Sequence, residues 1–166
     1  ALSMLSEHLA DPRLEDGIQL LHLLRYLQTT KSLRLEFKPR AQAHDSYPRL
    51  RVYSDSSFAE KEDNNRRSRS GLLVTLDGNP IYWKSKRQKL TACSTHEAEW
   101  MALFMATREA LYFRQLMEDL GYPQPHQTPV LVDSESAKFT ANSEVVTSAH
   151  RHIDVRMFRI RDHIRL

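Results

Sequence analysis

Three acidic residues, Asp55, Glu99 and Asp133, stand where their carboxylates could converge on one point. Asp55 and Asp133 each follow an apolar run typical of a β-strand, and Glu99 lies near the start of a long amphipathic helix. Carboxylates brought together repel one another unless a cation neutralises them. Carboxylate oxygens suit magnesium or manganese, and two such ions about 3.5–4 Å apart support phosphodiester cleavage. The spacing therefore predicts a metal site for phosphoryl transfer or hydrolysis.

Each of these acids also has a purely structural interpretation. An aspartate that ends a strand often forms a turn or caps a helix, and Glu99 could be a solvated helix residue. The neighbouring Glu97 fits the first helical turn, where an acid favours the helix dipole. Only the joint placement of two strand ends and one helix start favours a metal site.

The strands that must position Asp55 come first in this part of the chain. Apolar residues predict a strand at 50–53, and residues 71–76 and 81–84 form a hairpin around Asp77-Gly78. A continuation of the last strand toward Cys93 would leave that cysteine at a buried strand end. These segments predict an antiparallel three-stranded meander.

The helix that carries Glu99 begins at Ser94 or Thr95 and ends at about residue 119, before Gly121. A short strand at 129–132 then delivers Asp133. Helices are expected at 134–143 and 148–164.

This order of elements predicts an α/β fold with a mixed sheet and flanking helices. The helical connection is long enough for the strand at 129–132 to lie parallel to the first strand. The carboxyl ends of these two strands then meet at a crevice, which is where open sheets place their sites. Asp55 and Asp133 lie at those ends.

Residues 1–48 have a different character and predict a separate helical segment. Apolar periodicity indicates helices at 2–9 and 13–28, followed by a strand at 33–37 and a polar linker at 39–48. We place the domain boundary there, with a second domain at 49–166.

Composition sets limits on the kind of protein. The chain has 166 residues and a net charge of +3, which is compatible with a polyanionic partner. Its single cysteine permits no internal disulfide, and no run of apolar residues is long enough for a signal peptide or a membrane span. An intracellular location, in the cytoplasm or the nucleus, is therefore expected.

Basic residues cluster in the loop after the first predicted strand and at the end of the third. Runs of this kind are usually solvated surface, but these could lie on one side of the sheet and hold phosphates. The candidate nucleic-acid-binding residues are Arg66, Arg67, Arg69, Lys84, Lys86 and Arg87.

Several motifs in this order resemble a known family. They are LLRYLQTT (23–30), YSDSSFAE (53–60), NRRSRSG (65–71), IYWKSKRQ (81–88), STHEAEWMAL (94–103), VDSESA (132–137) and HRHIDVRMFRIRD (150–162). The chain resembles the ribonuclease H domain of Ty1/copia-type retrotransposon Pol polyproteins, preceded by the tail of the reverse-transcriptase connection region.

The resemblance implies a ribonuclease H-like fold and two bound magnesium ions, with manganese as a substitute. It implies hydrolysis of the RNA strand of RNA–DNA hybrids, as part of a reverse transcriptase/ribonuclease H. Asp55 resembles the family's first acid and Asp133 the third. Glu99, rather than Glu97, matches the second, because an apolar residue and a run of small residues follow it.

The sequence departs from the family pattern at its carboxyl end. The family has a fifth strand, a last helix and a fourth acid, and this chain ends at Leu166 before them. Asp154 resembles a substitute but belongs to the preceding helix. The alternative function is therefore an inactive ribonuclease H-like domain that binds nucleic acid or protein. An integrase is disfavoured, because its glutamate would come last.

Overall fold

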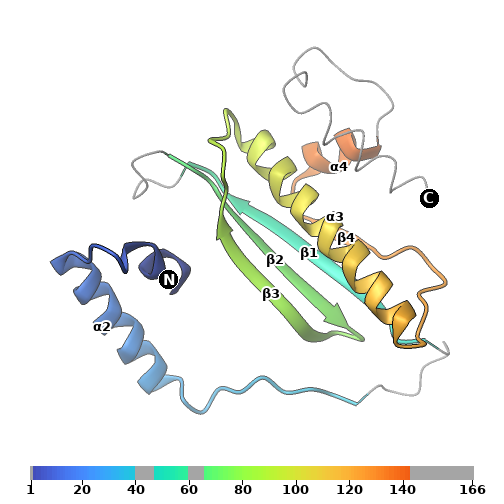
Figure 1. Ribbon diagram of the computed structural model, residues 1–166, viewed down its shortest axis with the longest axis horizontal. Helices are drawn as coiled ribbons and strands as arrows, with labels where there is room; N and C mark the ends of the chain where they lie inside the picture. The colour runs from blue at the N-terminus through green and yellow to red at the C-terminus, as the bar shows by residue number, and fades with distance from the viewer. Residues whose placement is uncertain (1, 40–46, 60–65, 143–166) are drawn as a thin grey trace. The chain divides into compact units, whose positions relative to one another are not determined.

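The computed structural model describes residues 2–39, 47–59 and 66–142 (Figure 1). The chain forms two compact units, Ala1–Lys38 and Pro39–Leu166. The assignment of residues 1–48 as a connection segment and of 49–166 as a ribonuclease H-like domain stays a prediction. The expected helix at 148–164, with Asp154, lies outside the described residues.

The first unit is helical. It contains α1 (Leu2–Leu5), a 3-10 turn (Ser6–His8) and α2 (Leu14–Thr29). The α2 amino end is closed by Asp16, whose carboxylate accepts a hydrogen bond from the Arg13 backbone N–H at 2.8 Å. The strand expected at 33–37 is wrong, because these residues have no regular secondary structure. Their alternating apolar side chains are exposed, and a strand without a hydrogen-bonded neighbour is not stable.

The second unit is built on a four-stranded sheet of order β3-β2-β1-β4 (Figure 1). The antiparallel strands β1 (Leu50–Ser57), β2 (Arg69–Leu76) and β3 (Asn79–Arg87) form the expected meander. The short strand β4 (Val130–Val132) pairs with β1 in parallel, as predicted. The α/β fold class, with a mixed ribonuclease H-like sheet, is therefore confirmed.

Helix α3 (Thr95–Asp119) packs along the sheet (Figure 1). Ser94 caps it, since its Oγ accepts a hydrogen bond from the Glu97 backbone N–H at 3.1 Å. Gly121 follows the helix end with φ +83°, a backbone conformation that glycine adopts without strain. Small residues on the buried side of α3 let the helix approach the strands closely. They are Ala98, Ala102, Ala106 and Ala110.

Helix α4 (Glu135–Asn142) follows β4. The fully buried Trp100 indole packs between α3, β4 and α4, together with Leu103, Ala141 and Val132. No helix in the described part of the chain has the length and apolarity needed to cross a membrane.

Strand β3 ends at Arg87, so the expected continuation to Cys93 is wrong. The chain bends at Lys89 and Leu90. Just before the bend, the buried Gln88 donates from Nε2 to Ser70 Oγ at 2.8 Å and to the Ala98 carbonyl at 2.9 Å. These bonds tie the end of β3 to β2 and α3. Cys93 lies beyond this point and is exposed rather than buried.

Candidate metal centre

The structure brings together the carboxylates of Asp55, Glu99 and Asp133. One oxygen from each lies within 4.8 Å of the others. Asp55 lies in the second half of β1, and Asp133 directly follows β4. The parallel register pairs Ser54 with Val132, so the next residue on each strand is one of the two aspartates. Glu99 comes from the amino-terminal part of α3.

Glu99 is the buried member of this acidic trio, with 7% of its surface exposed. Its Oε1 accepts a hydrogen bond from Ser56 Oγ at 2.7 Å. Its Oε2 is buried and has no hydrogen-bond partner among the residues that the structure describes. A buried carboxylate oxygen without a partner is costly unless a proton or a cation satisfies it.

The electrostatics of the trio agree with this geometry. Burial raises the pKa of Glu99, the Ser56 hydroxyl partly opposes this, and the nearby Asp133 and Asp55 carboxylates raise it further. A divalent cation would reverse the balance, because it stabilises the ionised form.

Asp55 and Asp133 are exposed, in contrast to Glu99. Asp55 Oδ1 accepts a hydrogen bond from the Ser56 backbone N–H at 2.8 Å. Three carboxylates, with one buried oxygen left unsatisfied within the described part of the chain, form a donor set of hard oxygen atoms, which fits magnesium or manganese.

Glu97 does not belong to the trio. Its carboxylate accepts a hydrogen bond from the Cys93 backbone N–H at 2.6 Å, so it closes the amino end of α3. Ser56, in contrast, was missed by sequence reasoning. Its only signal was its place next to Asp55 at the end of β1, where nothing local shows which residue its hydroxyl contacts.

The basic residues of β2 and β3 lie toward the same end of the sheet as Asp55. Arg69 pairs with Ser57 of β1 on one side and with Arg87 of β3 on the other. Arg69 is buried, whereas Lys86 is exposed. Arg66 and Arg67 lie in the segment just before β2, separated from it by Ser68. The six predicted nucleic-acid-binding residues therefore do not form one uniform patch.

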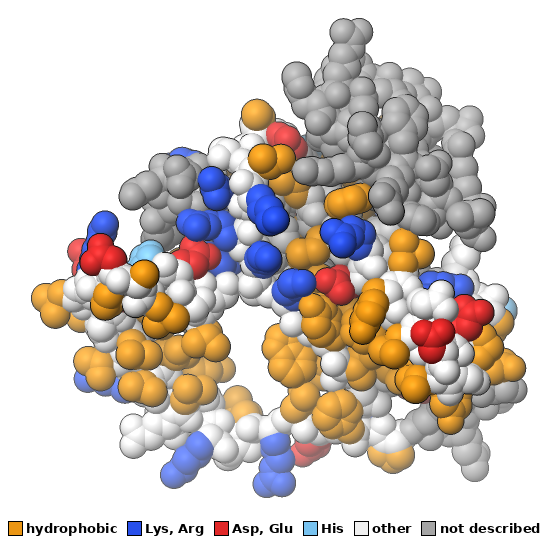
Figure 2. Space-filling view, viewed as in Figure 1, with side chains coloured by type: hydrophobic (Ala, Val, Ile, Leu, Met, Phe, Trp, Pro, Cys, Tyr) orange, Lys and Arg blue, Asp and Glu red, His pale blue; other side chains and the backbone are white. Residues whose placement is uncertain are grey.

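A groove of about 360 Å³ runs between β3 and α3. Lys84, Lys86, Lys89 and Arg108 line it together with apolar residues of α3. Figure 2 shows Lys and Arg side chains gathered on this face of the molecule. Lys84 donates to Glu109 Oε1 at 3.2 Å, and this bond is the main cause that raises the pKa of Lys84.

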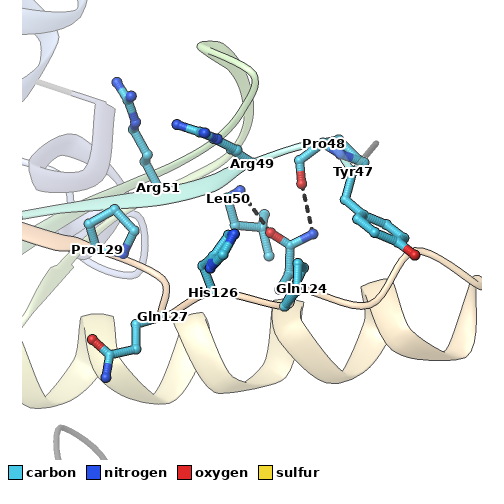
Figure 3. Close-up of a pocket in the computed structure, with 10 residues that line it drawn as sticks. Tyr47, Pro48, Arg49, Leu50, Arg51, Gln124, His126, Gln127 and Pro129 are labelled. Atoms are coloured by element: carbon cyan, nitrogen blue, oxygen red, sulfur yellow. Dashed lines mark hydrogen bonds between the residues drawn. The ribbon is translucent and has the colours of Figure 1, made fainter. Parts of the chain in front are cut away.

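A second cavity, of about 520 Å³, lies at the opposite end of β1 and β4 (Figure 3). Gln124 bridges two backbone groups beside it, since its Oε1 accepts from the Leu50 N–H at 3.2 Å and its Nε2 donates to the Pro48 carbonyl at 2.7 Å. Among the described residues, no acidic side chain lines this cavity. Of the two ends of the sheet, only the carboxyl end of β1 and β4 gathers acids in the part of the chain that the structure describes.

Comparison with known proteins finds similar sequences among retrotransposon Pol polyproteins. The chain is 34% identical to the retrovirus-related Pol polyprotein from transposon TNT 1-94 of Nicotiana tabacum, over 98% of this chain and 12% of that polyprotein. It is 27% identical to the Pol polyprotein from transposon RE2 of Arabidopsis thaliana, over 99% of this chain and 11% of the relative. A third relative, the secreted RxLR effector protein 161 of Plasmopara viticola, is 39% identical over 68% of this chain and 75% of its own length.

Among solved structures, the chain is similar to the N-terminal RNase H domain of rv2228c from Mycobacterium tuberculosis. The identity is 11%, with a TM-score of 0.44, over 69% of this chain and 76% of that chain. No protein-family model matches the sequence.

The mixed sheet with an acidic trio at the carboxyl ends of its parallel strands defines a ribonuclease H-like domain. The chain belongs to the family of copia-type retrotransposon Pol polyproteins, as the ribonuclease H-like domain of such a polyprotein. It spans only 12% and 11% of the lengths of the two Pol relatives named above.

Proposed function

We propose that this domain hydrolyses the RNA strand of RNA–DNA hybrids, with Asp55, Glu99 and Asp133 as the ligands of divalent metal ions. The observation that carries the proposal is the convergence of three carboxylates, one of which keeps a buried oxygen that no other described residue satisfies. Family membership supports the same reading. The metal we propose is magnesium, as two ions, with manganese as a functional substitute.

The three acids have different roles in this proposal. Glu99 is buried and held by Ser56, so it provides a fixed ligand deep in the site. Asp55 and Asp133 are exposed, so their oxygens are open to the side from which a substrate phosphate would approach. When bound, divalent ions neutralise the acids and stabilise the charge that develops on a phosphodiester during hydrolysis.

The basic residues beside the sheet would hold the substrate by its phosphates. The candidates are Lys84, Lys86 and Arg87 of β3, with Arg66 and Arg67 before β2, and the groove adds Lys89 and Arg108. Phosphate contacts of this kind give affinity without sequence specificity and weaken as salt rises. A nuclease that must cut hybrids of any sequence needs this form of binding.

The wider context of the domain is also a proposal. The Pol relatives are polyproteins, and this chain corresponds to a small part of each. We propose that the domain acts beside a reverse transcriptase in such a polyprotein, and that the helical segment before it belongs to the connection between them.

Cleavage of a labelled RNA–DNA hybrid in magnesium and in manganese tests the proposal. We expect metal-dependent cutting of the RNA strand that is lost in the Asp55→Asn variant, because that change removes one ligand charge and preserves the side-chain volume. Double-stranded DNA of the same sequence serves as the substrate control and is expected to remain intact.

Absence of cutting, with hybrid binding that falls steeply as salt rises, would instead support the inactive binding domain. Cutting that Asp55→Asn leaves unchanged would contradict the assignment of the acidic trio.

A further inference from the structure

His96, in the first turn of α3, links this helix to α4. Its Nε2 lies 2.8 Å from the indole Nε1 of Trp100, one helical turn further on. Its Nδ1 lies 3.2 Å from Ser136 Oγ, in the first turn of α4. Trp100 is buried in the core formed by α3, β4 and α4. His96 therefore connects a buried side chain of one helix to the amino end of another.

The partners determine which ring nitrogen of His96 carries the proton. An indole N–H only donates, so Nε2 of His96 must accept, and the ring must be neutral there. Nδ1 then carries the hydrogen and donates to Ser136 Oγ. The imidazole thus accepts a hydrogen bond from Trp100 and donates one to Ser136.

The link continues to the residue next to Asp133. Ser136 Oγ lies 3.0 Å from Ser134 Oγ, and Ser134 Oγ caps α4 by accepting from the Ala137 backbone N–H at 3.2 Å. Ser134 is covalently bonded to Asp133, so the position of this cap fixes the turn in which Asp133 stands. On the other side, Glu99 lies in α3 between His96 and Trp100.

We propose that His96 and Ser136 are positioning residues that fix the separation of Glu99 and Asp133. This inference rests on the proposed function, in which both acids bind the metal. α3 carries Glu99, and Asp133 directly precedes Ser134, which caps α4. The His96–Ser136 bond joins the first turns of these two helices. Neither residue touches the substrate in this account. Their effect is to hold two ligands at the separation that a metal ion requires.

Four variants separate this role from simple stability. Ser136→Ala removes the hydroxyl at an exposed position, and Ser136→Thr retains a hydroxyl there as the matched control. His96→Ala removes the other partner, and the double variant combines both losses. Manganese affinity is measured for each by titration calorimetry, and urea unfolding in the presence of a chelator confirms that each variant is folded.

The indole N–H resonance of Trp100 reports the link without any metal. The chain has two tryptophans, of which Trp83 is exposed and Trp100 is buried. We expect His96→Ala to shift the Trp100 indole N–H signal and speed its exchange with solvent. Trp83 should be unaffected in the same spectrum.

We expect Ser136→Ala and His96→Ala each to weaken manganese binding about tenfold, the scale of losses when a group that orients a metal ligand is removed. Ser136→Thr should retain the wild-type affinity. The double variant should lose no more than either single variant, because both changes break the same link.

Wild-type manganese affinity in Ser136→Ala, or losses that multiply in the double variant, would overturn the positioning role. An unchanged Trp100 indole signal in His96→Ala would overturn the link itself. If the wild-type protein binds no manganese, the proposed metal site is wrong, and the positioning role falls with it. This failure is distinct from failure of the positioning role alone, because it is seen in the wild type without any variant.

Discussion

The two ends of the β1–β4 strand pair differ in whether their polar groups are satisfied by hydrogen bonds within the chain. At the amino end, Gln124 satisfies backbone groups of Leu50 and Pro48. Arg114 completes this end by donating to the Gln124 carbonyl at 2.9 Å and to the His126 carbonyl at 2.7 Å. At the carboxyl end, three acids gather and Glu99 Oε2 is left without a partner among the described residues.

This difference assigns a structural role to the amino end of the strand pair and a functional role to its carboxyl end. Polar groups that the chain satisfies by itself hold the fold, because each bond formed avoids the cost of an unmet donor or acceptor. Acids that the chain gathers without neutralising them add nothing to stability and need a ligand. Changes at the amino end should therefore affect stability alone, and changes at the carboxyl end should affect metal binding and catalysis.

The largest effect is expected for Glu99→Gln. The amide retains the shape of the side chain and the Ser56 contact but loses the charge. Loss of a group that only supports a metal ligand weakens binding by up to about 100-fold, so loss of the ligand itself should weaken manganese binding further. The free energy of unfolding in a chelator should stay the same or rise, because repulsion from Asp55 and Asp133 is removed. Calorimetry and urea unfolding measure the two quantities, and an unchanged manganese affinity would contradict the assignment.

The next effect is expected at the other end of the strands. Gln124→Ala leaves the Leu50 N–H and the Pro48 carbonyl without this partner and should lower the free energy of unfolding by about 1–3 kcal/mol. Manganese affinity should remain within about twofold, since residues far apart contribute independently. The exposed Gln127, beside the same cavity, provides a Gln127→Ala control that should be as stable as the wild type. Equal losses of unfolding free energy in Gln124→Ala and Gln127→Ala would contradict the stabilising role of Gln124.

The raised pKa of Glu99 predicts a pH dependence of stability in the absence of metal. The folded protein keeps the Glu99 proton to a higher pH than the unfolded chain, whose carboxyl has its usual pKa of 4.5. The folded state therefore binds more protons between these two pKa values, and the free energy of unfolding falls as pH rises through that window. Urea unfolding across pH should show a contribution of this sign in the wild type that is absent in Glu99→Gln. A wild-type profile identical to that of Glu99→Gln would contradict it.

A smaller effect is expected for one phosphate contact in the groove. Lys86 is exposed, so Lys86→Ala should weaken hybrid binding modestly and reduce the slope of log affinity against log salt by about 1. Fluorescence anisotropy of a labelled hybrid at several salt concentrations measures the slope. Lys31→Ala, at an exposed position of the first unit, is the charge-matched control and should leave the slope unchanged.

Much of the fold could be predicted because its signals are local. Ser94 and Gly121 mark the ends of α3, and Asp77-Gly78 marks the β2–β3 turn. The parallel placement of β4 followed from the length of its helical connection. Once these elements were known, the proximity of the two aspartates followed from the rule that parallel strands end at the same edge.

The features that sequence analysis did not find depend on contacts between distant residues. The alternating apolar residues at 33–37 indicated a strand, but no neighbouring strand pairs with them in the described structure. Strand β3 ends at Arg87, and the next residue, Gln88, makes side-chain bonds that reach β2 and α3. The His96–Ser136 bond joins two helices across forty residues of sequence. No local pattern marks such pairs.

The most direct test of the central claim locates the metal itself. Substoichiometric manganese broadens nearby amide signals in the NMR spectrum of the nitrogen-15-labelled protein. We expect the amides around Asp55, Glu99 and Asp133 to broaden first, and Glu99→Gln to abolish this selectivity. Broadening centred on other acids, such as Glu118 and Asp119 at the far end of α3, would contradict a metal centre at the carboxyl end of the sheet.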